Sequence, residues 1–314
     1  MAKLEMRKVY TETLMELAEK DPDIVVLEAD LMRASGTASF KDKFPARTFN
    51  VGVAESNMVG IAAGLSATGK IPFAATFGCF AARRTYDQFF ISGCYAQNNV
   101  KLVGTDPGVT AAYNGGTHMP FEDMGIMRNI PKVVVFEPSD PVSLRSLVQK
   151  SARHKGCTYM RLHRKPAEVL YKENEVFELG KGKVLKDGRD VTIIAIGVVL
   201  VSEAVRAAGI LADRGIKAAV IDMHTIKPID KDLIVKYAEK TAAVVTCENH
   251  QIVNGLGSAV AEVLIENKPV PMKRIGVNEE FGEVGTLDYL KERFGFTAEK
   301  IAENIENFLK TKKG

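Results

Sequence analysis

The stretch FNVGVAESNMVGIAAGL (residues 49–65) places an apolar, strand-like run directly before a helical pattern of small residues. A single carboxylate, Glu55, lies at the junction, where most neighbours are Val, Ile, Ala or Gly. A carboxylate taken out of water is costly unless it is paired, hydrogen-bonded or protonated. Glu55 is therefore either an acid that complements the dipole of a helix start or a group whose proton the protein uses.

The overall composition is that of a globular protein. The 314 residues are 46% hydrophobic and 26% charged, which predicts about two domains. The net charge of +3 and the dispersed lysines argue against a nucleic-acid partner, and the terminal KTKKG is interpreted as a solvated helix end. The longest apolar run (191–201) is too short for a membrane span, and the N-terminus lacks a signal-type core. Four separated cysteines without CxxC complete the prediction of a cytoplasmic, reduced protein with no membrane partner.

Short Val/Ile-rich runs alternate with helical patterns along the whole chain, which predicts an α/β fold. We expect two domains, each a mostly parallel sheet flanked by helices, at residues 1–170 and 188–314. The charged, glycine-containing residues 171–187 are expected to form a linker or an edge segment. Strands are predicted at 23–30, 48–53, 71–77, 100–106, 132–138, 157–162, 191–197, 217–223, 242–249 and 272–277. Helices are predicted at 6–19, 55–67, 81–96, 122–128, 141–152, 201–214, 231–240, 255–266 and 298–309.

The loops after the predicted strands are the candidate ligand sites, because open parallel sheets bind ligands at the carboxyl ends of their strands. Phe77 and Phe80 form either a core pair or a stacking platform for a flat ligand. The glycine-rich loop 104–123, which carries His118, has the length typical of functional loops. Two other strand ends supply polar residues, namely Asp30, Ser35, Arg161 and Arg164. Each arginine is either an ordinary surface residue or a group that binds phosphate through two hydrogen bonds.

Several common motifs are missing from the sequence. It has no GxGxxG, GxxxxGK[ST] or HExxH, and NGLGSAVAE (254–262) lacks the third glycine of a dinucleotide loop. With five histidines and dispersed cysteines, we predict that this chain alone holds no metal.

Taken together, the motifs resemble the C-terminal part of transketolase, a thiamine-diphosphate enzyme. GVAESNMVGIAAGL, PFAATFGCF, GGTHMPFEDMGIMRNIP, ENHQIVNGLGSAVAE and FGEVGTL follow in the family's order, a pyrimidine-binding domain and then the C-terminal domain. The family's GDG motif and downstream Asn, which hold Mg²⁺ in its diphosphate-binding domain, are absent. The resemblance implies the C-terminal subunit of a split transketolase. Its N-terminal partner subunit would hold Mg²⁺ (or Ca²⁺) and the diphosphate, with two of each chain in the assembly.

The resemblance also implies roles for individual residues. Glu55 matches the glutamate that bonds N1′ of the aminopyrimidine, and His118 matches a catalytic histidine near the donor sugar. The remaining matches are Phe77, Phe80, Asp30 and Arg83 for the cofactor, and Arg7, Ser35, Asn114 and Arg164 for the substrate. Two departures concern sugar contacts, because Asn114 replaces an expected acid and Thr105 an expected histidine at the start of the same loop.

The activity implied is ping-pong transfer of a two-carbon ketol unit from a ketose phosphate to an aldose phosphate, as in the pentose phosphate pathway. Two other enzymes share the plan, the β subunit of a 2-oxo-acid dehydrogenase E1 component and 1-deoxyxylulose-5-phosphate synthase. A non-catalytic binding module that kept the fold is a further alternative. The GGTHMPFED loop favours transketolase over the E1 subunit, and Glu55, Phe77, Phe80 and His118 together argue against a binding module.

Overall fold

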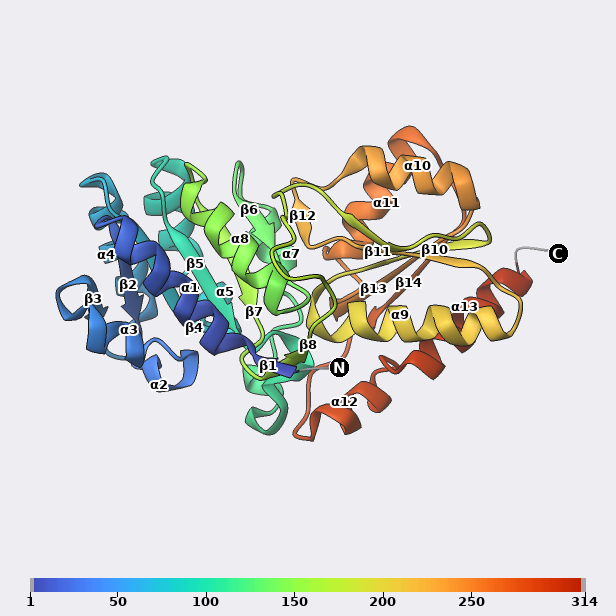
Figure 1. The fold of residues 1–314 in the computed structure, drawn as a ribbon, viewed down its shortest axis with the longest axis horizontal. Coiled ribbons are helices and arrows are strands. Elements are labelled where there is room, and N and C mark those ends of the chain that lie inside the picture. The colour runs from blue at the N-terminus through green and yellow to red at the C-terminus, as the bar shows by residue number, and fades with distance from the viewer. Residues whose placement is uncertain (1–2, 312–314) are drawn as a thin grey trace.

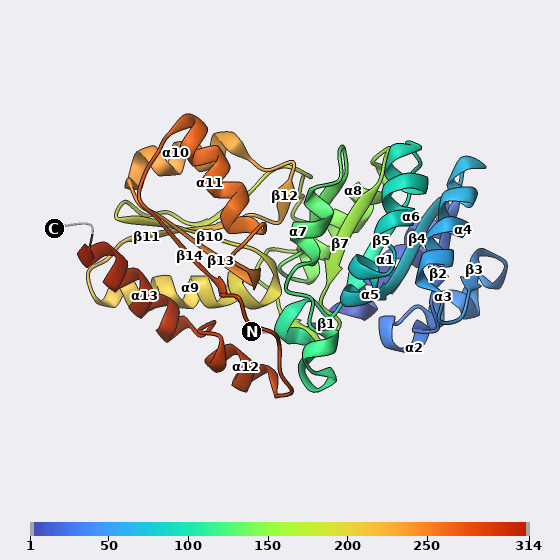
Figure 2. The same ribbon diagram turned by 180° about the vertical axis from the view of Figure 1, so that it is seen from behind.

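The chain folds into two sheet-based units that stand side by side in the computed structural model, which describes residues 3–311 (Figure 1). The N-terminal half, blue to green, forms most of one unit, and the C-terminal half, yellow to red, forms the other, except that β12 (Thr225–Lys227) joins the first sheet. Each sheet is mostly parallel and carries helices on both faces, as the view from behind also shows (Figure 2). The predicted α/β class with two helix-flanked sheets is confirmed.

The first sheet has seven strands in the order β12-β6-β7-β5-β4-β2-β3. Along β2, Ile24 and Val26 pack with helix α1 (Met6–Lys20), whereas Val25 and Leu27 pack with helix α4 (Glu55–Ala67). Successive side chains of a strand point to opposite faces, so a strand covered on both sides reads as a continuous apolar run. The strands are β2 Ile24–Glu28, β3 Thr48–Asn50, β4 Ile71–Phe77, β5 Lys101–Thr105, β6 Val134–Phe136, β7 Thr158–Leu162 and the antiparallel β12 Thr225–Lys227.

Helices cover the two faces of this sheet. Helix α1 packs beside α8 (Pro141–Arg153) on one face, and α8 starts with a capping box between Asp140 and Ser143. Helix α4 and the segment after β4 cover the other face. The remaining elements are β1 Lys3–Glu5, β8 Pro166–Glu168, α2 Met32–Ser35, α3 Ala38–Lys43, η1 Pro45–Arg47, α5 Gly78–Arg83, α6 Tyr86–Gln88, π-helix η2 Phe89–Tyr95, η3 Gly108–Asn114, η4 Gly116–His118 and α7 Asp123–Arg128.

The second sheet has five strands in the order β14-β13-β10-β11-β9, with β9 antiparallel at its edge. Helices α9 and α13 lie on one face, and α10 and α11 lie on the other (Figure 1). The elements are β9 Lys183–Lys186, β10 Val191–Ala195, α9 Gly197–Asp213, β11 Ala218–Asp222, α10 Lys231–Thr241, β13 Val244–Gln251, α11 Leu256–Asn267, β14 Met272–Val277, α12 Leu287–Arg293 and α13 Ala298–Thr311.

All ten predicted strands are present, but one predicted helix is wrong. Residues 81–96 do not form one helix, because the chain divides into α5, α6 and η2. The Thr85 hydroxyl bonds the Ala81 carbonyl, a contact that bends helices. Gly93 in η2 lies so close to Cys157 that a Cβ there would be 3.3 Å from the sulfur. The helix predicted from 201 starts earlier, at Gly197, whose φ of 77° favours glycine.

The predicted linker contains β9, which pairs with β11 as an edge strand of the second sheet. Tyr171 and Phe177 within it are buried, with ring centroids 4.7 Å apart. The limits 1–170 and 188–314 stay a prediction. Of the terminal KTKKG, Lys310 and Thr311 lie in α13, and residues 312–314 lie outside the described residues. Between residues 3 and 311, no helix is long and apolar enough to cross a membrane.

Candidate functional site

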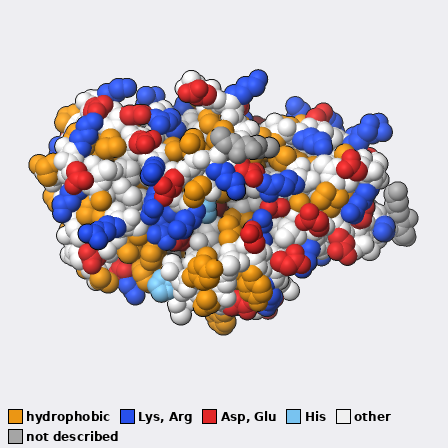
Figure 3. Space-filling view, turned by 60° about the horizontal axis from the view of Figure 1, so that its bottom comes forward, with side chains coloured by type: hydrophobic (Ala, Val, Ile, Leu, Met, Phe, Trp, Pro, Cys, Tyr) orange, Lys and Arg blue, Asp and Glu red, His pale blue; other side chains and the backbone are white. Residues whose placement is uncertain are grey.

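The carboxyl ends of β2, β3, β4, β5 and β7 meet at one edge of the first sheet, because these strands run parallel. The loops that follow them carry the predicted site residues. Figure 3 brings this side of the molecule forward and shows Lys and Arg side chains gathered near the middle of the face, with hydrophobic side chains below them. The edge therefore combines positive charge with apolar surface.

Three rings form a cluster at the centre of this edge. Phe77 ends β4, Phe80 lies in the first turn of α5, and His118 ends η4. The ring centroids of Phe77 and Phe80 are 6.0 Å apart, and His118 lies edge-on 6.0 Å from Phe77 and 5.3 Å from Phe80. The Thr117 hydroxyl is 2.8 Å from Nδ1 of His118. The predicted aromatic pair and histidine therefore come together across two loops.

Glu55 lies next to this cluster and is paired with a cation. It is the first residue of α4, its side chain is 5% exposed, and its Oε1 accepts a 2.7 Å hydrogen bond from Nη1 of Arg84. The Arg84 guanidinium also stacks 3.9 Å from the Phe80 centroid. Glu55, which the sequence places among apolar residues, thus has a guanidinium as its direct partner. Sequence reasoning missed Arg84, because only the turn after α5 brings it to α4 and no local motif indicates that contact.

Two predicted substrate arginines converge on one carbonyl. Nη1 of Arg7 and Nη1 of Arg164 each donate to the Ala34 carbonyl at 3.3 Å. Nε of Arg164 is 2.7 Å from Asp106 Oδ1, and Nη2 bonds the other Asp106 oxygen. Arg7 pairs with Glu5 at 2.6 Å, and Arg164 lies 4.9 Å over the Phe77 ring. The turn before Ser35 is thus bordered by two guanidinium groups beside the ring cluster, an arrangement that suits a multivalent anion.

Ser35 and Asp30 follow β2 but face in different directions. Ser35 is buried, and its hydroxyl bonds the buried Glu28 rather than either arginine. Asp30 is exposed with a φ of 64°, and its backbone N–H donates to Asn50 Oδ1 at 3.0 Å. Asn50, which sequence reasoning did not select, donates back to the Asp30 carboxylate at 3.2 Å.

Three further predicted positions lie around the long loop after β5. Nε of Arg83 bonds Glu122 at 2.6 Å and its Nη1 bonds the Thr117 carbonyl at 3.3 Å, so it braces the loop that carries His118. Asn114 is exposed at the end of η3. Thr105 is the last residue of β5 and is buried, so it directly precedes the long loop.

The second unit holds this loop in place. The Asn249 side chain accepts from Val109 N–H at 2.9 Å and donates to the Pro107 carbonyl at 2.9 Å. The backbone N–H of Gln251 donates to the Phe121 carbonyl at 2.7 Å. A Cβ on Gly108 would lie 2.2 Å from the Asn249 amide oxygen, so only glycine fits there. The motif ENHQ (248–251) drew attention to Asn249 and Gln251, but it did not indicate that they contact the loop after β5.

A cavity of about 790 Å³ lies where the loop meets the second unit, and Phe281 on its rim is 96% exposed. Among the residues that the structure describes, no group of three or more His, Cys, Asp or Glu is arranged to hold a metal ion. The edge as a whole offers a buried acid, a ring wall and paired arginines, so it suits a flat heteroaromatic ligand and an anionic substrate.

Two family models match the chain. The transketolase pyrimidine-binding domain matches residues 2–168, and the transketolase C-terminal domain matches residues 180–301. The 6-deoxy-6-sulfo-D-fructose transketolase subunit SqwH of Clostridium sp. (strain MSTE9) is 52% identical over 94% of this chain and 92% of its own. A protein of Methanocaldococcus jannaschii named "Putative transketolase C-terminal section" is 45% identical over 97% of this chain and 96% of its own.

Among solved structures, a split-gene transketolase, described as an inactive β4 tetramer, superposes with a TM-score of 0.90. It is 43% identical and covers 98% of this chain and 99% of its own. A transketolase from Campylobacter jejuni superposes with a TM-score of 0.84 at 21% identity, and this chain spans 47% of it. The first match is with a protein of the same extent, and the second shows the fold alone.

Proposed function

The chain belongs to the transketolase family as a C-terminal (β) subunit, and from that premise we propose that it works as half of a two-chain transketolase. The reaction proposed is the transfer of a two-carbon ketol unit from an anionic ketose to an aldose phosphate. The observation that carries this proposal is the juxtaposition of buried Glu55 with the Phe77, Phe80 and His118 rings. One continuous edge then leads from these rings to Arg164 and Arg7.

The family depends on thiamine diphosphate, and the described residues fit one end of that cofactor. An aminopyrimidine needs a flat apolar wall and a carboxyl group at a ring nitrogen, and Phe77, Phe80 and Glu55 provide these groups. When bound, the thiazolium supplies the electron sink for the transferred fragment. Glu55 would hold a proton at the pyrimidine nitrogen, and burial strengthens that contact because few solvent dipoles compete. When the cofactor binds, Arg84 must either release its hydrogen bond to the Glu55 carboxylate or share that carboxylate with the pyrimidine.

The substrate would occupy the space between the ring cluster and the arginines. His118, close to both rings, would donate to or accept from a sugar hydroxyl near the reacting carbon. Arg7 and Arg164 would hold the anionic end by charge-assisted hydrogen bonds, which fixes the carbonyl relative to the cofactor. Asp30 and Asn50 at the end of β2 and β3 would form one rim of the site.

The diphosphate and its Mg²⁺ (or Ca²⁺) would be held by a separate N-terminal subunit, with two of each chain in the assembly. Two observations support this. The sequence has no GDG motif, and the split-gene relative of matching length is described as an inactive tetramer of β chains. We expect this chain alone to be inactive. Cytoplasmic location and a place in pentose phosphate metabolism are part of the same proposal.

The nature of the anionic group has a second candidate. The relative at 52% identity is named for 6-deoxy-6-sulfo-D-fructose, a sugar sulfonate. A sulfonate presents three oxygens to the same pair of arginines, so the donor here would be a ketose phosphate or a sulfoketose. Parallel assays with fructose 6-phosphate and 6-deoxy-6-sulfofructose separate these donors by their kcat/KM.

The proposal is tested by reconstitution with an N-terminal transketolase chain. Activity is measured with xylulose 5-phosphate plus ribose 5-phosphate, with pyruvate plus a lipoyl domain, and with pyruvate plus glyceraldehyde 3-phosphate. We expect turnover in the first assay, or with the sulfoketose donor, and only when both chains and thiamine diphosphate are present. Turnover only with pyruvate would overturn the proposal in favour of the E1 subunit or the synthase. A folded complex that shows no thermal stabilisation by thiamine diphosphate and Mg²⁺ would indicate a binding module.

A further inference from the structure

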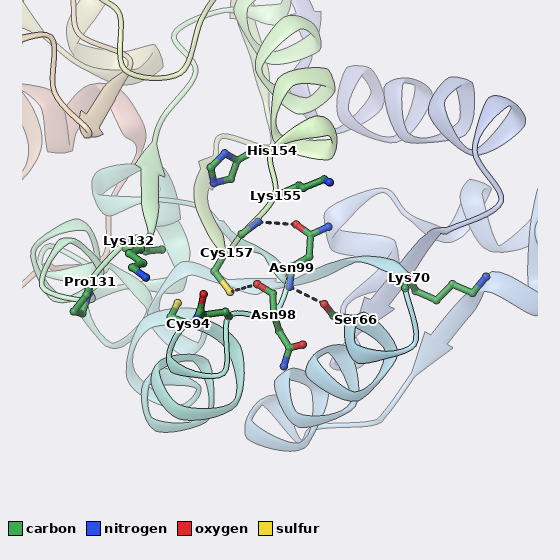
Figure 4. A pocket seen from close by; sticks show the side chains of 14 residues that line it. Ser66, Lys70, Cys94, Asn98, Asn99, Pro131, Lys132, His154, Lys155 and Cys157 are labelled. Atoms are coloured by element: carbon green, nitrogen blue, oxygen red, sulfur yellow. Dashed lines mark hydrogen bonds between the residues drawn. The ribbon is translucent and has the colours of Figure 1, made fainter.

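A cavity of about 630 Å³ opens at the amino ends of β5 and β7, on the opposite edge of the first sheet from the candidate site (Figure 4). Two cysteines enter it from different elements. Cys94 comes from η2, and Cys157 directly precedes β7. The polar lining includes Lys70, Asn98, Asn99, Lys132 and Lys155. The proposed transferase function uses none of these groups.

The two sulfur groups interact directly. The Cys94 thiol donates a side-chain hydrogen bond to Cys157, and the Cys157 thiol donates to the Asn98 carbonyl at 3.3 Å. Gly93 lies against the Cys157 sulfur, since a Cβ at that glycine would be 3.3 Å away from it. The cavity therefore brings both cysteines into one space, where a disulfide, whose S–S bond is roughly 2.05 Å, would join η2 to the start of β7.

The surroundings give the two thiols different character. The hydrogen bond from Cys94, the Val100 N–H and the charge of Lys101 lower the pKa of Cys157, against burial, which raises it. The same hydrogen bond raises the pKa of Cys94. Burial lowers the pKa of Lys101 to about 7, but its Nζ donates to Asn99 Oδ1 and to two backbone carbonyls at 2.7–2.8 Å, which favours the charged amine. Cys157 is thus the better nucleophile of the pair.

The other two cysteines provide a contrast within the same chain. Cys79 in α5 and Cys247 in β13 are completely buried in their hydrophobic surroundings. Burial raises the pKa of Cys79 to about 11 and raises that of Cys247 further. Neither lines the cavity. They are built as inert core thiols and serve as internal references.

We propose that Cys94 and Cys157 form a reversibly oxidised dithiol, with hydrogen peroxide or a related small peroxide entering through the cavity. The Cys157 thiolate attacks one peroxide oxygen, the O–O bond breaks, and the leaving hydroxide takes up a proton as water. Cys157 is then a sulfenic acid. The Cys94 sulfur attacks the Cys157 sulfur, the S–O bond breaks, and hydroxide leaves with the Cys94 proton as a second water. The two thiols lose two electrons, and the peroxide is reduced to water.

The experiment treats the full-length chain, alone and in complex with its partner subunit, with hydrogen peroxide. Remaining thiols are alkylated, and the peptides are mapped by mass spectrometry without reduction. We expect a Cys94–Cys157 crosslink that forms at least about tenfold faster than any change at Cys79 or Cys247. Dithiothreitol should reverse it. Equal oxidation of all four cysteines, or disulfides only between chains, would overturn the proposal.

Two variants test the order of the steps. In Cys94→Ser, Cys157 should stop at the sulfenic acid and be captured by dimedone. In Cys157→Ser, Cys94 should remain a thiol at the same peroxide dose, and oxidation at the wild-type rate would contradict the assigned roles. Short-time dimedone labelling of the wild-type chain gives the same test where a variant does not fold. Label at Cys157 before Cys94 is expected, and the reverse order would refute the mechanism.

Discussion

The two sheets end their parallel strands in similar charged loops, yet these two edges have different surroundings. At the edge of the first sheet, His118 is half-buried and Arg84 and Arg7 reach solvent. At the edge of the second sheet, Glu248 and His250 near the end of β13 are completely buried. His250 accepts from the Gly125 N–H of the first unit at 3.2 Å, and Glu248 accepts from Leu256 and Gly257 N–H at the start of α11. Position at the carboxyl ends of strands is thus shared by a candidate active site and by a packed interface.

The difference lies in what the polar groups contact. Arg161, from the first unit, is fully buried where the two units meet. It bonds Asp123 at 2.9 Å, Glu137 at 2.6 Å and the Asn249 carbonyl at 2.9 Å. The Arg161 side chain is completely buried, whereas the Arg7 and Arg164 side chains are 31% and 13% exposed and share one backbone carbonyl, that of Ala34, as acceptor. An arginine at a strand end is therefore a candidate ligand-binding residue only if a ligand anion can replace one of its acceptors within the protein.

The largest effect is expected from breaking the buried interface. Among residues 3–311, Arg161 is the only cation that forms an ion pair with Asp123 or Glu137, and Arg161→Met removes both pairs. Uncompensated buried carboxylates make the free energy of unfolding fall by about 3–5 kcal/mol. Urea denaturation measures this loss.

The matched control is Arg145→Met, which removes an exposed ion pair with Glu16. Exposed pairs contribute about 1 kcal/mol or less. Equal losses for the two variants would contradict the comparison of a packed edge with an open one.

The next effect concerns the acid of the open edge. Glu55→Gln keeps the shape of the side chain but removes its proton-holding group, so kcat of the reconstituted enzyme should fall at least about a hundredfold. Steady-state assays measure it, and Glu16→Gln is the matched control on the surface. A near-normal rate in Glu55→Gln, with the protein folded, would refute the assigned role.

A smaller effect is expected at the anion end of the same edge. Arg164→Ala should raise KM for phosphorylated or sulfonated sugars by roughly tenfold to a hundredfold, since a bond to a charged group contributes about 1.5–3 kcal/mol. Thiamine diphosphate binding should not change, and the control is Arg214→Ala on the far unit. An equal loss with uncharged sugars would argue against an anion contact.

A pH-dependent effect is expected from a buried acid beneath the open edge. Burial raises the pKa of Glu28 from 4.5 to about 7, despite hydrogen bonds from Ser35 and Thr37. The folded state therefore binds the proton more tightly than the unfolded state. The stability from the neutral acid is fully present below about pH 4.5 and is lost as the pH rises through about 7.

The change Glu28→Gln should flatten this decline, by up to about 1.4 kcal/mol for each pH unit. Urea denaturation of both proteins between pH 5 and 8 measures it. The difference between the two curves isolates Glu28 from other titrating groups, such as His163, whose lowered pKa acts in the opposite direction. Parallel curves would show that Glu28 does not titrate in this range.

The sequence by itself determined ten of the strands, the α/β class and the loops that carry Glu55, Phe77, Phe80 and His118, but not β1, β8, β9 or β12. Runs of β-branched, apolar residues are local properties, and so is a glycine-rich loop after a strand. The order of the motifs was sufficient to indicate the family. The helix predicted at 81–96 is wrong because Thr85 bonds a backbone carbonyl and Gly93 contacts the distant Cys157. Hydrophobic periodicity indicates neither contact.

Only the tertiary structure decided which polar groups meet. The pairing of Arg84 with Glu55, the Asn249 contacts that hold the His118 loop, and the inward turn of Ser35 join residues whose sequence spacing carries no signal. The same holds for Arg161, which looked equivalent to Arg164 at a strand end but lies in the interface. The physical reason is that charge pairing depends on distance in space and on burial, and both are set when helices and sheets pack against one another.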